Sequence, residues 1–208
     1  TSSTYHGFAV ASLVLSVAPK AKLVIAKVLD DKGMGDPRRT AQGIRYCINK
    51  KCDIINCSIA GPMDNDLEDV INEAYDKGII VVAATGNDGR NMLLYPASYL
   101  NCISVGSINK SLDISPFSNY NVFMTMVAPG EDIIFNINGE KIKDSGTSFS
   151  APLVSGTLAL LKEKLKEELG RKPEYSELYN ELIKNCVIAN NIDMIKQGHG
   201  HLDFGAKA

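Results

Sequence analysis

The sequence lacks the features that would place the protein in a membrane or on a nucleic acid. No apolar run approaches the roughly 20 residues of a membrane-spanning helix, and no signal peptide is recognisable. The formal net charge of −2 at pH 7 gives no basic surface of the kind that binds phosphate backbones. Internal repeats, low-complexity stretches and linkers are also missing. We therefore expect one domain over residues 1–208, with neither a membrane nor a nucleic acid as its partner.

The cysteines show no sign of a disulfide framework. Their number is odd, their spacing follows no framework pattern, and Cys57 and Cys102 lie in apolar, strand-like runs. Such residues are typical of buried, reduced thiols, which favours a cytoplasmic location over secretion, the alternative. The five cysteines are Cys47, Cys52, Cys57, Cys102 and Cys186.

Apolar runs alternate with helical stretches along the first half of the chain. With 45% hydrophobic residues, a chain of this length can bury a full core. Alternation of this kind predicts an α/β fold with a doubly wound, mostly parallel twisted sheet and helices on both faces. Asn138-Gly139 between two β-rich runs predicts a hairpin. The expected strands are 23–29, 53–59, 79–84, 102–108 and 124–128, and the expected helices include 40–51, 65–77 and 174–188.

A glycine turn leads directly into a long helix near residue 148. Gly146 can adopt backbone angles closed to other residues, and from Leu153 onward apolar residues recur with a helical period. Ser148 would then lie on the first turn, where unpaired N–H groups and the helix dipole stabilise a developing oxyanion. We expect Pro152 within that same turn. Ser148 is therefore a nucleophile candidate, although Gly-Thr-Ser by itself is more often an ordinary helix cap.

Two further segments place a polar residue beside an apolar run. His6 opens a second predicted helix, in which Val10, Ala11 and Val14 follow at helical spacing and would anchor it by packing. A buried strand ending in Gly-Asn-Asp-Gly would deliver Asn87 to the edge of the sheet. Alone, the first would be a structural histidine and the second a turn asparagine.

Together, and in this chain order, the segments around His6, Asn87 and Ser148 resemble the subtilisin-like serine proteases, or subtilases. The resemblance covers nearly the whole chain, in the family's order and close to its spacing. Further segments that carry it are Val17-Ala18-Pro19, Ile54-Ile55-Asn56-Cys57-Ser58, Tyr95-Pro96-Ala97, Val127-Ala128-Pro129-Gly130 and Gly198-His199-Gly200-His201-Leu202-Asp203.

The resemblance implies a serine endopeptidase that hydrolyses peptide bonds through an acyl-enzyme. Ser148 would attack the scissile carbonyl, His6 would take its proton and pass it to the leaving amine, and Asn87 would donate its side-chain amide to the oxyanion. The backbone N–H of Ser148 would be the second donor. A peptide or protein is the implied substrate.

One expected element of the family is missing from the sequence. Subtilases carry the triad aspartate on a strand upstream of the histidine, and none of the five residues before His6 is an acid. The aspartate orients the imidazole, and in subtilisin its removal alone costs about 3 × 10⁴ in turnover. Its strand would lie inside the sheet, where a gap leaves backbone groups unpaired. We therefore expect an N-terminal companion fragment that carries the strand and the aspartate, and little activity from this chain alone.

The alternative is a catalytically inactive relative that keeps the fold as a peptide- or protein-binding module. An upstream coding sequence with an Asp-centred strand would favour the enzyme, as does the joint presence of His6, Asn87 and Ser148.

Substrate contacts are implied on two short segments. Ser58-Ile59-Ala60 resembles the family's edge segment that pairs with an extended substrate, and Gly33-Met34-Gly35 resembles the opposing one. Asp88 would lie at the rim of the pocket for the residue before the scissile bond. The segment Arg90-Asn91-Met92-Leu93-Leu94 is shorter than the family's usual loop before Tyr95-Pro96 and has a leucine where small residues are frequent, which predicts a shallow pocket that prefers a small or medium side chain.

No metal and no cofactor are expected. The helix after His6 continues without room for the calcium loop that many subtilases insert there. His199 and His201 are spaced like a metal pair, but no carboxylate or cysteine accompanies them at ligand spacing.

Overall fold

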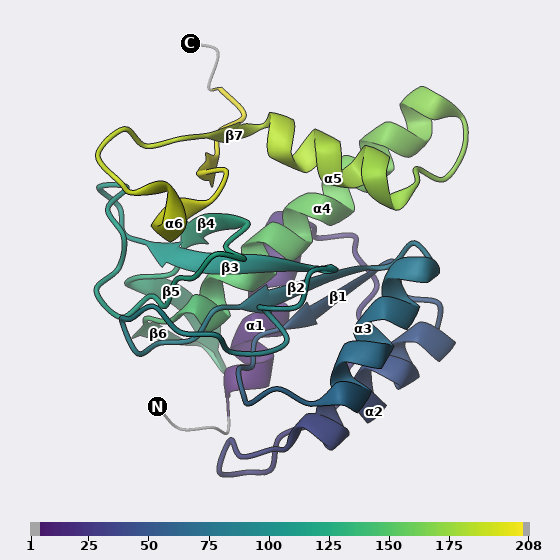
Figure 1. The fold of residues 1–208 in the computed structure, drawn as a ribbon, viewed down its shortest axis with the longest axis horizontal. Coiled ribbons are helices and arrows are strands. Elements are labelled where there is room, and N and C mark those ends of the chain that lie inside the picture. The colour runs from purple at the N-terminus through teal and green to yellow at the C-terminus, as the bar shows by residue number, and fades with distance from the viewer. Residues whose placement is uncertain (1–4, 206–208) are drawn as a thin grey trace.

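A central six-stranded sheet lies between two layers of helices in the computed structural model, which describes residues 5–205 (Figure 1). Neighbouring strands are parallel except for the antiparallel pair β7–β8. The prediction of a mostly parallel α/β sheet is therefore confirmed, while the predicted domain span of 1–208 extends at both ends beyond the described residues. In spatial order the strands are β1 (Ile54–Cys57), β2 (Ile80–Ala84), β3 (Cys102–Ile108), β4 (Met126–Pro129), β8 (His201–Leu202) and β7 (Cys186–Val187).

Helices cover both faces of this sheet (Figure 1). One face packs against α2 (Pro37–Asn49) and α3 (Asn65–Asp76). The other packs against α4 (Thr147–Leu169), with α1 (His6–Val17) and α5 (Tyr175–Lys184) in turn packed on α4. A short α6 (Met194–Gln197) precedes β8.

The strand β2 shows why two layers of helices are needed. All five of its residues are buried, and alternate side chains point to opposite faces of a sheet. Val81 and Ala83 accordingly join the core under α2 and α3, whereas Ile80 and Val82 join the core under α4.

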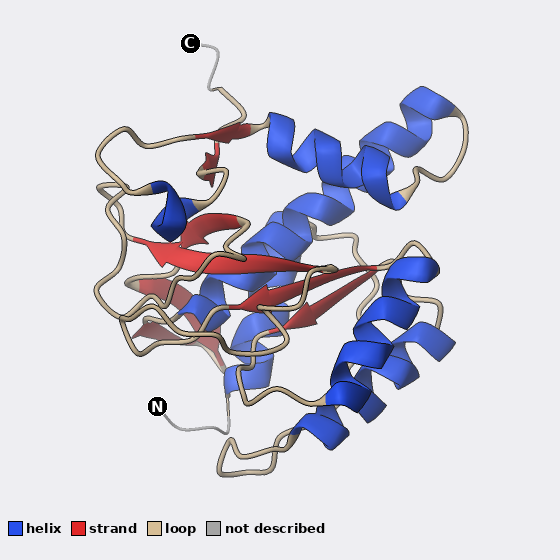
Figure 2. Cartoon of the chain, in the orientation of Figure 1, coloured by secondary structure: helices blue, strands red, loops and turns tan. Residues whose placement is uncertain are grey.

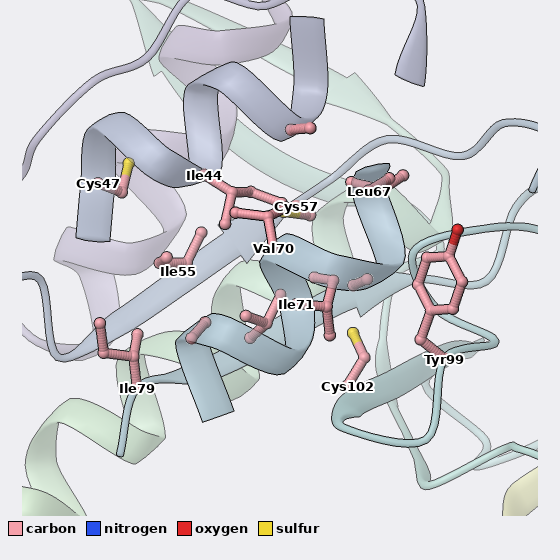
Figure 3. Close-up of a cluster of buried hydrophobic side chains, with 14 of the residues drawn as sticks. Ile44, Cys47, Ile55, Cys57, Leu67, Val70, Ile71, Ile79, Tyr99 and Cys102 are labelled. Carbon is pink, nitrogen blue, oxygen red and sulfur yellow. The ribbon is translucent and has the colours of Figure 1, made fainter. Parts of the chain in front are cut away.

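Three cysteines lie in the first of these cores, drawn in Figure 3. Burial raises the pKa of Cys47 to about 11 and that of Cys57 to about 12, and raises the pKa of Cys102 as well. All five cysteines are free thiols in the structure. The prediction of buried, unpaired thiols is confirmed for these three.

The predicted strand 23–29 is wrong: the chain between α1 and α2 is loop throughout (Figure 2). A strand requires a partner, and among the described residues β1 pairs only with β2, which leaves its other edge open beside this segment. Side chains suited to a strand therefore face solvent, with Ile25 68% exposed.

The other expected elements are present with shifted ends. The helix expected at 40–51 begins at Pro37, because the Asp36 side chain caps it by accepting from the Arg39 N–H. The hairpin around Asn138-Gly139 is present as β5 (Ile133–Ile137) and β6 (Glu140–Asp144). Within the described part of the chain, no helix is long and apolar enough to cross a membrane.

Candidate active site

The end of β2 and the start of α4 bring Asn87 and Ser148 together. Asn87 Oδ1 accepts hydrogen bonds from the Thr147 backbone N–H and hydroxyl, both at 2.9 Å. The Gly86 N–H donates to the Thr147 hydroxyl at 3.1 Å. This network fixes the orientation of the Asn87 side-chain amide, and no described acceptor is bonded to the Nδ2 donor of Asn87.

Gly146 does not have the unusual backbone angles expected of it. Its φ of 162° is extended, which any residue can adopt, and the expectation was therefore wrong. A Cβ there would lie 3.4 Å from Asn87 Nδ2, an ordinary van der Waals distance. The residue thus borders the amide directly.

Pro152 lies inside α4, one turn beyond its predicted place, because the helix already begins at Thr147. Proline has no N–H to offer to the carbonyl four residues earlier. The Ser148 carbonyl therefore lacks its helical partner, and the Ser58 hydroxyl donates to it instead at 2.7 Å.

His6 stands on the first turn of α1, close to the start of α4. Its ring centroid lies 6.1 Å from that of Phe149, the residue after Ser148. Burial lowers the pKa of His6, and the nearby Asp144 carboxylate partly opposes this shift. Within residues 5–205 no hydrogen bond joins His6 to Ser148, whose hydroxyl donates to the Ser58 carbonyl at 3.3 Å.

The helix that carries His6 is held by a different face from the one predicted. Ala9 and Leu13 are its buried residues and pack against Phe149. Val10, Ala11 and Val14 are only partly buried and line a groove instead.

That groove, of about 1890 Å³, joins the three predicted catalytic residues. It runs from His6, Asn87 and Ser148 along the open edge of β1 and under the loop between α1 and α2. It is therefore a candidate active-site cleft that continues along the edge of β1 that no described strand pairs with.

The predicted substrate segments both line this groove. Ser58, Ile59 and Ala60 follow β1, whereas Gly33, Met34 and Gly35 lie in the loop before α2. Within that loop the backbone of Gly35 lies against Leu29, since a Cβ on Gly35 would be 2.6 Å from Leu29 Cδ2.

Asp88 also borders the groove, but it is not free. Its N–H donates to Asn119 Oδ1 at 2.9 Å, and its carboxylate accepts from Asn119 Nδ2 at 3.0 Å. The sequence did not single out Asn119 or Asp144, because their positions carry no periodic or motif signal and only the fold brings them to the site. Asn56 lies in a segment that carries the family resemblance, but no role was predicted for it.

The described residues contain no group of three or more histidine, cysteine, aspartate or glutamate side chains that could hold a metal ion. His201 lies in β8, on the side of the sheet away from β1.

Comparison with known proteins identifies the relatives of this chain. The model described as the subtilase family matches residues 1–200. The chain is 40% identical over 182 residues to the major intracellular serine protease of Bacillus subtilis (strain 168), covering 84% of this chain and 57% of that protein. It is also 40% identical over 196 residues to an intracellular serine protease of Paenibacillus polymyxa, covering 91% and 60%. The chain thus spans less than two thirds of these relatives.

Solved structures agree in fold. A lanthipeptide protease superposes with a TM-score of 0.87 at 25% identity, covering 96% of this chain and 73% of that one. The self-cleaved protease domain of PatA gives a TM-score of 0.86 at 28% identity, covering 96% and 80%.

Proposed function

Because the chain belongs to the subtilase family, we propose that it is the larger part of a serine endopeptidase that acts on peptides or proteins. The observation that carries the proposal is the shared groove, in which a helix-borne histidine, a fixed amide and a serine on a helix start come together.

The chemistry follows from these positions. The Ser148 hydroxyl oxygen bonds to the scissile carbonyl carbon while its proton passes to His6. His6 then protonates the leaving amine as the C–N bond breaks, and a water molecule, deprotonated by His6, hydrolyses the acyl-enzyme. Asn87 Nδ2 and the Ser148 N–H stabilise the oxyanion in both steps.

The groove also supports a companion segment outside the described residues that supplies the triad carboxylate. A β-strand placed between β1 and the loop 18–36 would pair with the open edge of β1 and cover the half-exposed Leu23 and Val24. Its carboxyl end would lie beside those of the other parallel strands, near His6. An aspartate there would orient the imidazole and favour its protonated form.

The substrate would bind as an added strand between the two segments that line the cleft. Main-chain groups of 58–60 and 33–35 would hold an extended peptide, with alternate side chains in pockets. Asp88 would lie at the rim of the pocket before the scissile bond, where its exposed carboxylate contributes about 1 kcal/mol or less to a preference for a basic residue.

We also propose a cytoplasmic location. Its support is the set of free, buried thiols together with two relatives that are named intracellular proteases.

An intact-mass spectrum of the native protein, before and after reaction with a fluorophosphonate, tests these proposals. We expect a second fragment to accompany the chain and Ser148 to be labelled, with no labelling of a Ser148→Ala control. A folded chain that is alone and unlabelled would instead support the binding-module alternative. Labelling of the chain without any companion would refute the need for an added strand.

A further inference from the structure

A line of hydrogen bonds connects the middle of α4 to the carbonyl of Ser148. The Ser155 hydroxyl donates to Asn56 Oδ1 at 2.9 Å, and Asn56 Nδ2 donates to the Ser58 hydroxyl at 2.9 Å. The Ser58 hydroxyl donates in turn to the Ser148 carbonyl at 2.7 Å. The Ser155 hydroxyl also lies 3.1 Å from the Ala151 carbonyl oxygen, its alternative acceptor. The Asn56 amide fixes the direction of the line, because its Oδ1 can only accept and its Nδ2 can only donate.

The line starts and ends on one face of α4. Ser155 lies seven residues after Ser148, which is almost two full turns of an α-helix. Asn56 lies on the same face of β1 as Ile54, which packs into the core under α4. The helix and the strand are therefore joined twice, once at each end of the line.

The surroundings make this line costly to break. Ser155 is 4% exposed and Ser58 is 7% exposed, so a lost partner is not replaced by bulk water. Pro152 lacks the N–H that would be the regular helical donor to the Ser148 carbonyl four residues earlier. The Ser58 hydroxyl donates to that carbonyl in its place.

We infer that Asn56 and Ser155 are positioning residues for Ser148, an inference that rests on the function proposed above. They orient the Ser58 hydroxyl toward the Ser148 carbonyl, and this contact sets the rotation of the first turn of α4. The same turn carries the Ser148 hydroxyl and the N–H proposed as an oxyanion donor. Their loss should slow attack by Ser148 without weakening the binding of the substrate.

The variant Ser155→Ala tests the inference with the native full-length protein. Its matched control is Thr157→Val, which removes a hydroxyl that donates to the Leu153 carbonyl at 2.9 Å on the same helix but lies outside the line. We expect the limiting rate of fluorophosphonate labelling to fall about fivefold in Ser155→Ala, with the half-saturating concentration unchanged. The control should react at the wild-type rate.

The double variant Asn56→Ala/Ser155→Ala adds a signature that a general loss of stability would not give. If the two residues act through one line, the double variant should react no more slowly than Asn56→Ala alone. Equal rates for Ser155→Ala and Thr157→Val, or fully additive losses, would overturn the inference.

Crystal structures of the wild type, Ser155→Ala and Thr157→Val provide a readout that does not depend on activity. We expect the contact between Ser58 Oγ and the Ser148 carbonyl to lengthen beyond 3.5 Å in Ser155→Ala and to persist in Thr157→Val. A wild-type protein that is not labelled would refute the proposed function, and the inference would then be decided by these structures. If the contact between Ser58 Oγ and the Ser148 carbonyl is retained in Ser155→Ala, the inference is overturned.

Discussion

Gly156 is one of the points at which the helix carrying Ser148 touches the helix carrying His6. An added Cβ would lie 2.7 Å from Val17 Cβ and 3.0 Å from the Val14 carbonyl oxygen. Carbon atoms in contact prefer about 3.5–4.0 Å, so Gly156→Ala should push α1 away by about 1 Å. The glycine thus sets the distance between the two helices.

Gly156→Ala should change the free energy of unfolding and the rate of Ser148 labelling by different amounts. Overpacking costs about 1–3 kcal/mol, while alanine gains about 1 kcal/mol over glycine inside a helix. We therefore expect a net loss of unfolding free energy of about 2 kcal/mol or less. Because a misplacement of about 1 Å can cost about 10²-fold in rate, labelling of Ser148 should suffer more than stability does.

Urea unfolding and the rate of fluorophosphonate labelling measure the two effects. Gly7→Ala is the control for stability, since a Cβ at Gly7 of α1 meets nothing within 4 Å. That variant should be stabilised by less than the roughly 0.5–1 kcal/mol that alanine gains over glycine in the middle of a helix, because Gly7 lies in the first turn of α1. A Gly156→Ala protein that is stabilised like Gly7→Ala and labelled at the wild-type rate would refute the reasoning.

Three further outcomes follow from the site. Asn87→Ala should lower kcat about a hundred- to a thousandfold, as in subtilisin, with KM nearly unchanged; a loss below tenfold would argue against an oxyanion role. Leu94 Cδ1 lies 2.6 Å from where a Cβ of Gly86 would be, so Leu94→Ala should deepen the pocket. We expect the ratio of kcat/KM for a peptide with phenylalanine before the scissile bond to kcat/KM for the same peptide with alanine there to rise roughly tenfold. An unchanged ratio would place the pocket elsewhere. Asp144 raises the pKa of His6 by favouring the imidazolium, so Asp144→Asn should lower that pKa and move the acid limb of the kcat/KM profile to lower pH. A shift to higher pH would contradict this sign.

Local patterns were sufficient for most elements of the fold. The fully buried run of β2 and the Asn-Gly turn between β5 and β6 each carry their signal within a few residues. The segment 23–29 has an equally strong local pattern, and it failed because a strand also requires a neighbour to bond with. Strand propensity alone could not reveal that, among residues 5–205, β1 pairs with a strand on one edge only.

The sequence by itself determined which residues could do the chemistry. Glycine before Thr147 and Ser148, a histidine on a helix start and an asparagine after a buried strand are local features with local causes. Only the tertiary structure decided how they are held: Asn87 by Thr147, and the Ser148 carbonyl by Ser58. Asn56 and Ser155, which form the line of hydrogen bonds behind Ser148, are 99 positions apart in the chain. Their contact depends on the packing of α4 on β1, and no pattern within either segment encodes that distance.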